Sequence, residues 1–330
     1  MSLRFDMYDA WLVILNPHAG VGKGAKDQAL IENLLNNHKV HYTLVVSEFP
    51  GHAIHLSKDR IIKGYHKIIV AGGDGTLNEV VNGIYSQDVI EPYKLKLGMI
   101  PIGTGNDWIR TFGIPLDYNK AIDTILLGNT VKQDVGRIVK KDEKNVETRF
   151  FANMTGYGFD AMVAHKANAM KNKGQSGLLL YLYSLLYSYV KYKAIRMHIK
   201  IDSGEISDQI FSCSIGIGKF NGGGMMQAPD AIPNNGFFQL TVIRKIGIWT
   251  LRKNLKGLFD GSFVHDKHVS THTVSRVELN SKIAIPGEAD GENLGFGIYS
   301  IDMLPHALNV IYGDGAYLDI EEPDLEHPKQ

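Results

Sequence analysis

Hydrophobic positions in the first part of the chain form short runs that alternate with stretches of helical periodicity. The runs WLVILN, YTLVVSE, KIIVAGG and KLGMIPIG predict strands, whereas KDQALIENLLNN, a segment around His52 to Lys63 and another starting at Thr76 predict helices. Strands that alternate with helices are typical of βαβ units around a parallel sheet. We therefore expect residues 1–134 to form an α/β domain with a parallel, Rossmann-like sheet.

Strand patterns dominate after residue 135. The segments RFFANMTG, AIRMHIKID, IFSCSIGIG, GFFQLTVI, TVSRVELN and KIAIPGEAD predict short strands separated by turn residues. This pattern favours an antiparallel β-sandwich over residues 135–305, interrupted by a helix near Trp249 to Phe259. We expect residues 306–325 to pack back on the first domain and residues 322–330 to form a disordered tail.

The segment GLLLYLYSLLYSYVKYK, from Gly177 to Lys193, decides whether a membrane span is expected. It is apolar for about 14 residues before Lys191, whereas a helix needs about 20 apolar residues to cross a bilayer. We therefore expect no transmembrane segment but a buried helix, with a surface that touches lipid as the alternative.

The composition of the chain indicates which kinds of partner and which cellular compartment to expect. The chain has 35 basic and 35 acidic residues among 330, so no net field favours binding to nucleic acid. Cys213 is the single cysteine, which excludes an intramolecular disulfide and suits a reducing compartment. The start, MSLRFDMYDA, has aspartates where a signal peptide would be basic and then apolar. A cytoplasmic protein is expected.

The stretch AGGDGTLNEVVNGI carries the first candidate chemistry. It follows a strand that ends at Val70, and its glycines allow backbone N–H groups to approach a phosphate at the start of a helix. The carboxylate of Asp74 would repel that phosphate unless a divalent cation lay between them. A plain Gly-Asp-Gly turn with Thr76 as N-cap is the alternative, but it leaves Gly72 unexplained.

Two further loops contain glycine and polar residues directly after predicted strands. LNPHAGVGKG places Asn16, Pro17 and Gly20 there, and IPIGTGNDW places the run from Gly103 to Asp107 there. The stretch GVGKG does not match a P-loop, because no hydroxyl residue follows the lysine. We expect the three loops to converge on one ligand site.

These motifs together resemble the catalytic domain of the diacylglycerol kinase family, which includes bacterial soluble lipid kinases and the sphingosine and ceramide kinases. NPHAG, GGDGTLNEV and IPIGTGND occur in the family's order, followed by QDVGRI, FFANMTGYGFDAMV, GGGMMQAPDAIPNNGFFQLTVI and GEADGE. The resemblance covers nearly the whole chain. It implies a two-domain kinase that binds ATP and Mg²⁺ in the cleft between an α/β domain and a β-sandwich.

The resemblance also implies roles for individual residues. The nucleotide site would be lined by Asn16, Gly72, Gly73, Asp74, Gly75, Thr76, Gly103, Thr104, Asn106 and Asp107. Asp74 would organise the catalytic Mg²⁺, with Asp107 and Asp134 extending the acidic and water network around it. Asp230 would be the side-chain ligand of a separate structural metal. Asp290 and Glu292 would activate the lipid hydroxyl, so the catalytic set is Asp290, Glu292 and Asp74.

The residues of GEADGE allow two interpretations without the resemblance. Acidic side chains brought close together raise one another's pKa, which suits a proton acceptor beside a hydroxyl in phosphoryl transfer. A solvated hairpin turn of the Asp-Gly type explains the same residues equally well. The run HDKHVSTHT similarly suggests zinc, but its histidines lack a shared helical face, so surface histidines are favoured.

The sequence therefore predicts an ATP- and Mg²⁺-dependent lipid kinase that phosphorylates a hydroxyl of diacylglycerol or a similar lipid. A kinase for sphingoid bases or ceramide, a soluble-substrate kinase similar to NAD kinase, and a nucleotide-binding regulator without turnover are the alternatives. We expect transient, peripheral association with a membrane surface, and a homodimer is left open. The resemblance departs at Asn235 and Gly236, where many bacterial members have Asp-Gly, and near Ser184, where a lysine of some members is replaced.

Overall fold

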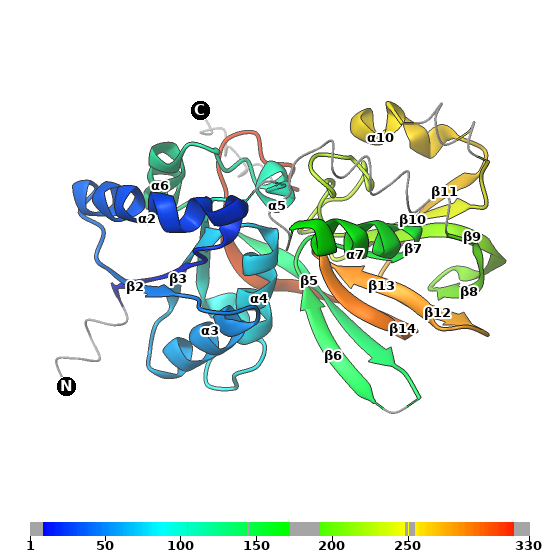
Figure 1. Cartoon of the computed structure of the whole chain (residues 1–330), viewed down its shortest axis with the longest axis horizontal. Helices are drawn as coiled ribbons and strands as arrows, with labels where there is room; N and C mark the ends of the chain where they lie inside the picture. The colour runs from blue at the N-terminus through cyan, green and yellow to red at the C-terminus, as the bar shows by residue number, and fades with distance from the viewer. Residues whose placement is uncertain are drawn as a thin grey trace, which may run out of the picture.

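The computed structural model describes residues 9–103, 105–143, 145–171, 192–247, 250 and 255–319 (Figure 1). The expected Tyr-rich helix and part of the helix expected near Trp249 lie outside these residues. Within the described part of the chain, none of the helices is both long and apolar enough to cross a membrane.

The first part of the chain alternates strands and helices as the hydrophobic pattern predicts. The elements are β1 (Trp11–Leu15), α2 (Ala19–Asn37), β2 (Tyr42–Val46), α3 (His52–Ile62), β3 (Lys67–Gly72), α4 (Asp74–Ile84), η1 (Pro92–Lys94), β4 (Lys96–Pro101), α5 (Asp107–Thr111) and α6 (Tyr118–Leu127). The four strands pair in parallel in the order β2-β1-β3-β4. Their carboxyl ends, and the loops that follow, therefore share one edge.

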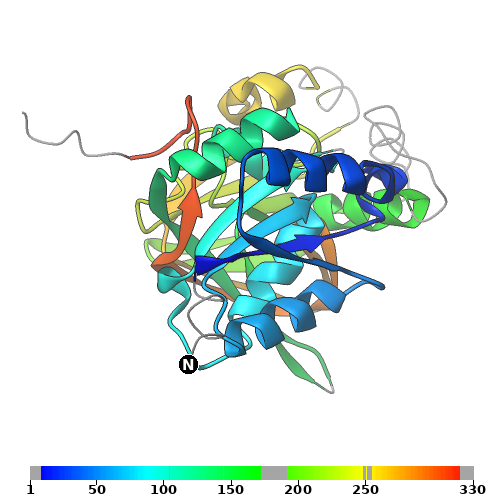
Figure 2. The ribbon, with the colours of Figure 1, turned by 90° about the vertical axis from the view of Figure 1, so that its left-hand side faces the viewer.

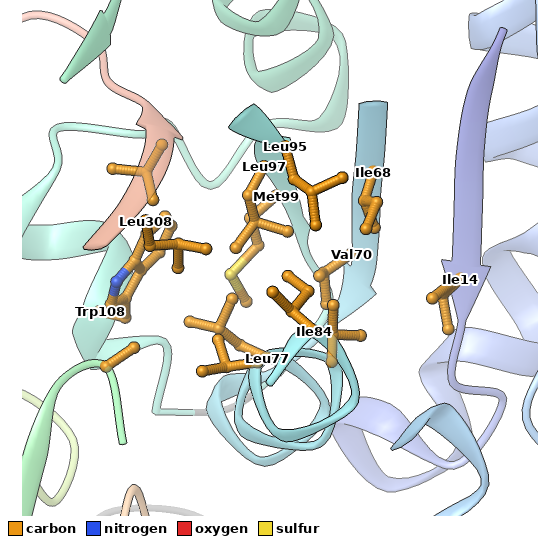
Figure 3. Close-up of a cluster of buried hydrophobic side chains, with 14 of the residues drawn as sticks. Ile14, Ile68, Val70, Leu77, Ile84, Leu95, Leu97, Met99, Trp108 and Leu308 are labelled. Atoms are coloured by element: carbon orange, nitrogen blue, oxygen red, sulfur yellow. The ribbon is translucent and has the colours of Figure 1, made fainter. Parts of the chain in front are cut away.

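Helices cover both faces of these parallel strands (Figure 2). Alternate residues of β1 point to opposite faces, and all five are buried. Leu12 and Ile14 join a core with α3 and α4, whereas Val13 and Leu15 join one with α2 and α6. Figure 3 shows Leu77 of α4 within the first of these cores. Burial on both faces explains the continuous apolar runs.

The second part is mainly antiparallel, as expected. Its elements are β5 (Thr130–Lys141), β6 (Val146–Phe151), β7 (Met154–Gly158), α7 (Phe159–Lys171), β8 (Ile195–Ile201), β9 (Gly204–Gly216), β10 (Phe238–Arg244), α10 (Gly257–Asp260), η2 (Ser262–His265), β11 (Val269–Val274), β12 (Arg276–Ser281), β13 (Ile285–Ala289) and β14 (Glu292–Ile311). The ladder β14-β12-β8-β9-β7-β13 returns to β14 and encloses a second core. The segments RFFANMTG and TVSRVELN each form parts of two strands rather than one.

The expectation of a separate Rossmann-like parallel sheet has to be corrected. Across the described residues, all fourteen strands belong to one continuous mixed sheet, of which β2-β1-β3-β4 is the parallel end. The long strands β5 and β14 pair along most of their length, and the end of β14 also pairs with β4 in parallel. Local hydrophobic patterns do not reveal which strands extend from one half of the molecule into the other, so the sequence suggested two sheets.

Candidate active site

Three loops meet beyond the carboxyl ends of the parallel strands. Asn16, after β1, donates from Nδ2 to Thr76 Oγ1 at 2.9 Å. Gly103, after β4, donates its N–H to Gly72 O at 3.3 Å. A methyl group placed on Gly103 would lie 2.7 Å from the Cα of Gly73, so these two loops need glycine in order to touch. The structure thus brings together the three motifs that the sequence singled out.

The N-terminus of α4 has the features of an anion site. Gly73 is its N-cap residue and has no side chain with which to cap the helix, so the backbone N–H groups of the first turn are suited to an anion. Nearby, the buried amide oxygen Asn106 Oδ1 has no hydrogen-bond partner among the described residues, while its Nδ2 donates to Gly103 O at 2.7 Å. A ligand or ordered water that donates to Asn106 would satisfy it. Thr104, expected here too, lies outside the described residues.

Asp74 begins α4 and points across to α5. Its Oδ1 accepts the N–H of Trp108 at 3.1 Å, and its Oδ2 accepts the N–H of Asp107 at 3.2 Å. The carboxylate therefore sits at the start of a second helix, where free N–H groups favour negative charge. This contact fixes the orientation of Asp74 relative to the loop after β4.

Asp107 links the first half of the molecule to the second. Its two oxygens accept the N–H groups of Gly223 and Gly224 at 2.8 and 2.6 Å. Burial, and secondarily the charge of Asp74, raises the pKa of Asp107 to about 6. Two neighbouring carboxylates that repel each other in a buried place form a donor set that a cation would stabilise.

The turn between β13 and β14 brings two more predicted residues next to α4. Asp290 is buried, and its carboxylate accepts hydrogen bonds from Asn78 Nδ2 and from the backbone N–H groups of residues 152–154 at 2.9–3.0 Å. Burial raises the pKa of Asp290, and these donors counteract that rise. Glu292 is exposed, and a methyl group on Gly75 would lie 2.7 Å from its Oε1.

Asp134 and Asp230 have different surroundings. Both oxygens of Asp134 accept backbone N–H groups, from Gly236 and His306, each at 2.7 Å. Asp230 is exposed, and beside it the Lys219 ammonium donates to Pro229 O. Among the described residues no group of three or more acidic, His or Cys side chains could enclose a metal ion. The metal roles of Asp134 and Asp230 stay predictions, and the surroundings of Asp230 do not make a side-chain cage.

Comparison with known proteins identifies the family. Residues 10–138 match the diacylglycerol kinase catalytic domain, and residues 153–312 match the YegS C-terminal NAD kinase beta sandwich-like domain. A diacylglycerol kinase from Staphylococcus epidermidis is 31% identical over 282 residues, covering 85% of this chain and 84% of its own. This chain belongs to the diacylglycerol kinase family.

Another relative is similar to this chain in sequence, and solved structures share its fold. The "Probable lipid kinase YegS-like" protein of Klebsiella pneumoniae is 29% identical over 91% of this chain and 95% of its own. The crystal structure of a candidate diacylglycerol kinase from Bacillus anthracis superposes with a TM-score of 0.76 at 21% identity, covering 94% and 99% of the two chains. Yeast NADH kinase shares the fold more distantly, with a TM-score of 0.52 and 11% identity over 92% and 83%.

Sequence reasoning missed several residues that organise this family's site here. Glu79 accepts the N–H groups of Gly51 and Ala53 and so holds the start of α3. Asn78 and Asn82, one helical turn apart, both donate to Phe150 O. Two asparagines at i and i+4 among the apolar residues of α4 were the available signal, because buried amides need specific partners.

Proposed function

We propose that this kinase transfers the γ-phosphoryl group of ATP to a hydroxyl of diacylglycerol or a similar long-chain lipid. The observation that carries the proposal is the approach of Glu292, from the other half of the molecule, to Gly75 in the first turn of α4, the helix that begins at Asp74. A phosphate site and an acceptor-side carboxylate then face one another across Gly75. Phosphoryl transfer needs mainly such positioning and charge stabilisation.

Asp74 and Asp107 would hold a magnesium ion together with phosphate oxygens, because hard cations prefer carboxylate and phosphate ligands. When bound, the ion would neutralise charge on the transferred phosphoryl group. The N–H groups at the start of α4 would bind and orient phosphate. Glu292, on the acceptor side, would orient the hydroxyl.

A mainly apolar cavity supports a lipid acceptor. It lies between α7, β9, β10 and the α10–η2 region, and its wall includes Phe159, Val163, Phe211, Ile243, Leu258 and Phe263. Asp160 and Ser212 add polar groups to the same wall. Burial raises the pKa of Glu288, and the charge of Asp160 adds to that rise; the strand of Glu288 leads into the Asp290 turn. A cavity with apolar walls and few polar groups fits an alkyl chain that continues from a polar head.

A lipid panel separates this proposal from its alternatives. Purified protein, ATP and Mg²⁺ would be mixed with micelles that contain diacylglycerol, ceramide or sphingosine, and separately with NAD, and labelled phosphate in each product would be measured. We expect the largest transfer to diacylglycerol or a close relative. Transfer only to sphingosine or ceramide would show that the substrate is a sphingoid lipid rather than diacylglycerol. Transfer only to NAD would replace the lipid function, and ATP binding without transfer would favour a regulator.

Asp74→Asn tests the phosphate end of the site. The substitution keeps the size of the side chain but removes its charge, so we expect kcat to fall by about 10²–10³-fold. Thermal unfolding should change little compared with this loss. The matched control is the exposed Asp88→Asn, which should keep its activity. Near wild-type kcat for Asp74→Asn would contradict the proposed role of this carboxylate.

If the acceptor is a lipid hydroxyl, the rate of phosphoryl transfer should depend on a lipid surface. Removing a long chain from lipid costs about 0.8 kcal/mol per methylene, so the acceptor should be taken from an interface rather than from water. At fixed bulk substrate, the rate should follow the surface fraction of substrate in mixed micelles. The rate should rise with the content of anionic lipid. It should fall with salt, because the Debye length, over which charges on the protein and the lipid attract, shortens to about 10 Å at 0.1 M. A rate independent of surface fraction would exclude surface action.

A further inference from the structure

The loop between β9 and β10, residues 217–237, is organised around the half-buried side chain of Lys219. The ammonium of Lys219 donates a hydrogen bond to Pro229 O, on the opposite limb of the loop. The main chain closes the loop at the same place, because Ala228 donates its N–H to Lys219 O at 3.2 Å. The two limbs of this loop are therefore joined through Lys219.

The groups around the Lys219 ammonium are those that stabilise a bound cation. Its Nζ lies 5.1 Å from the centroid of the Tyr317 ring, within the range of a cation–π interaction. Tyr317 is itself held in place, since its N–H donates to Thr111 O at 2.9 Å. Burial lowers the pKa of Lys219, and the nearby charge of Asp230 opposes that shift. A carbonyl oxygen, an aromatic face and a carboxylate thus surround one positive charge.

These contacts conflict with the separate metal ion that the resemblance implies at Asp230. A hard cation at this place would need carbonyl oxygens beside the carboxylate of Asp230. The carbonyl next to it in the chain, Pro229 O, already accepts the ammonium of Lys219. A divalent ion between that oxygen and Asp230 would lie close to a positive charge and would be repelled by it. The donor set therefore fits the ammonium of the chain itself and does not fit a metal ion as well.

The loop that Lys219 closes also reaches the candidate active site. Gly223 and Gly224, in the middle of the loop, donate their N–H groups to Asp107 at 2.8 and 2.6 Å. The N–H of Lys219 points to Thr111 Oγ1 at 3.4 Å, at the end of the helix α5 that begins with Asp107. The position of Lys219 is thus linked to both ends of α5.

We propose that Lys219 is an internal cation that takes the place of a structural metal ion in this loop and positions the backbone donors that hold Asp107. The loop then needs no divalent ion at Asp230 in order to fold. Lys219 is a positioning residue, because it acts on the site through Gly223 and Gly224. The effect on stability is independent of the kinase function, whereas the effect on turnover rests on the function proposed above.

Thermal unfolding without nucleotide, in EDTA and with added Mg²⁺ alone, tests the replacement of the metal. A bound ion raises the Tm in proportion to its occupancy of the folded state, so an ion held by Asp230 would be visible in this measurement. We expect Asp230→Asn to respond to EDTA and to Mg²⁺ as the wild-type protein does. A saturable rise of the wild-type Tm with Mg²⁺ that Asp230→Asn abolishes would overturn the proposal. This comparison does not depend on how any variant of Lys219 folds.

Substitutions of Lys219 separate its charge from its packing. Lys219→Met keeps most of the aliphatic chain but removes the ammonium, so its Tm in EDTA should fall by about 2–4 °C. Lys219→Arg keeps a positive charge and should lose less. Mg²⁺ should raise the Tm of Lys219→Met more than that of the wild-type protein, and Asp230→Asn should remove this gain. The matched control is Lys200→Met on the exposed side of β8, which should keep the wild-type Tm. Equal losses for the Met and Arg variants, with no added response to Mg²⁺, would overturn the proposal.

Steady-state kinetics test the positioning of Asp107. Lys219→Met should lower kcat about 3–10-fold and raise the Mg²⁺ concentration that gives half-maximal activity, because the donors to Asp107 become misplaced. In the Asp107→Asn background the same change should have little further effect. An equal loss of kcat in both backgrounds would contradict action through Asp107. Failure of the lipid kinase function is separately visible, because the wild-type protein would then transfer no phosphate to lipid while the Tm comparisons would keep their outcome.

Discussion

Buried carboxyl groups in this molecule differ in whether backbone N–H groups stabilise their negative charge. Asp107 and Asp290 both accept backbone N–H groups from elements distant in sequence. Asp160, in contrast, lines the apolar cavity, and burial raises its pKa to about 6. A carboxyl group in such a place is stabilised when it is protonated.

Asp160 therefore predicts a pH-dependent difference in stability. The pKa of Asp160 rises from 3.8 in the unfolded chain to about 6 in the folded protein. Its contribution to the free energy of unfolding is therefore most favourable below pH 3.8, and this advantage is lost as the pH rises through 6. Asp160→Asn should accordingly stabilise the protein at pH 7.5 by up to about 3 kcal/mol relative to its effect near pH 4. Urea unfolding at several pH values measures this difference.

The exposed Asp88→Asn serves as the control for that measurement, because it changes the same functional group outside the cavity. A stability difference between Asp160→Asn and wild type that stays constant from pH 4 to pH 7.5 would show that Asp160 does not titrate as its burial requires.

Among the elements, α4 contacts several others through residues beyond those that drew attention in its sequence. Asp74 contacts α5, Asn78 contacts the β13–β14 turn, and Glu79 holds α3. The side chain of Glu79 supplies the cap that α3 lacks locally, because its N-cap residue is Gly51. One helix thus fixes three surrounding elements by polar contacts.

Glu79→Ala should loosen the start of α3. The change leaves the N–H groups of Gly51 and Ala53 without their carboxylate acceptor, so we expect the free energy of unfolding to fall by about 1–2 kcal/mol. Denaturant unfolding measures the loss, and hydrogen exchange should become faster at the first turn of α3. Glu48→Ala, an exposed change just before the same helix, should cost much less. Equal effects of the two changes would argue against capping by Glu79.

The elements and the convergence of the loops could be predicted from the sequence because they depend on local patterns. Alternating apolar runs fixed the order of strands and helices, and glycines directly after strands marked the three loops. The partners of Asp290 could not be predicted, since Asn78 lies 212 residues away and an Asp-Gly turn does not show what its side chain contacts. The same limit applies to Glu79, whose partners precede it by a whole helix.

At the scale of the whole molecule, β5 and β14 join the two halves into one sheet. β14 spans Glu292–Ile311, pairs with β13 and β12 at one end, and pairs with β4 at the other. Its Leu308 belongs to the same core as Trp108 (Figure 3). Unfolding the first half would therefore expose a core and strand edges that β14 covers, while also breaking the contacts of Asp107 and Asp290.

This continuity predicts a single cooperative unfolding transition. Trp11 and Trp108 are buried in the first half, and the third tryptophan, Trp249, can be replaced in Trp249→Phe so that fluorescence reports that half alone. Far-ultraviolet circular dichroism follows the strands of both halves. Because neither half buries its apolar surface without β14, the two denaturant curves should coincide in midpoint and slope. A fluorescence transition at clearly lower denaturant than the dichroism transition would show that the first half unfolds independently, and that the pairing of β14 with β4 does not couple the two halves.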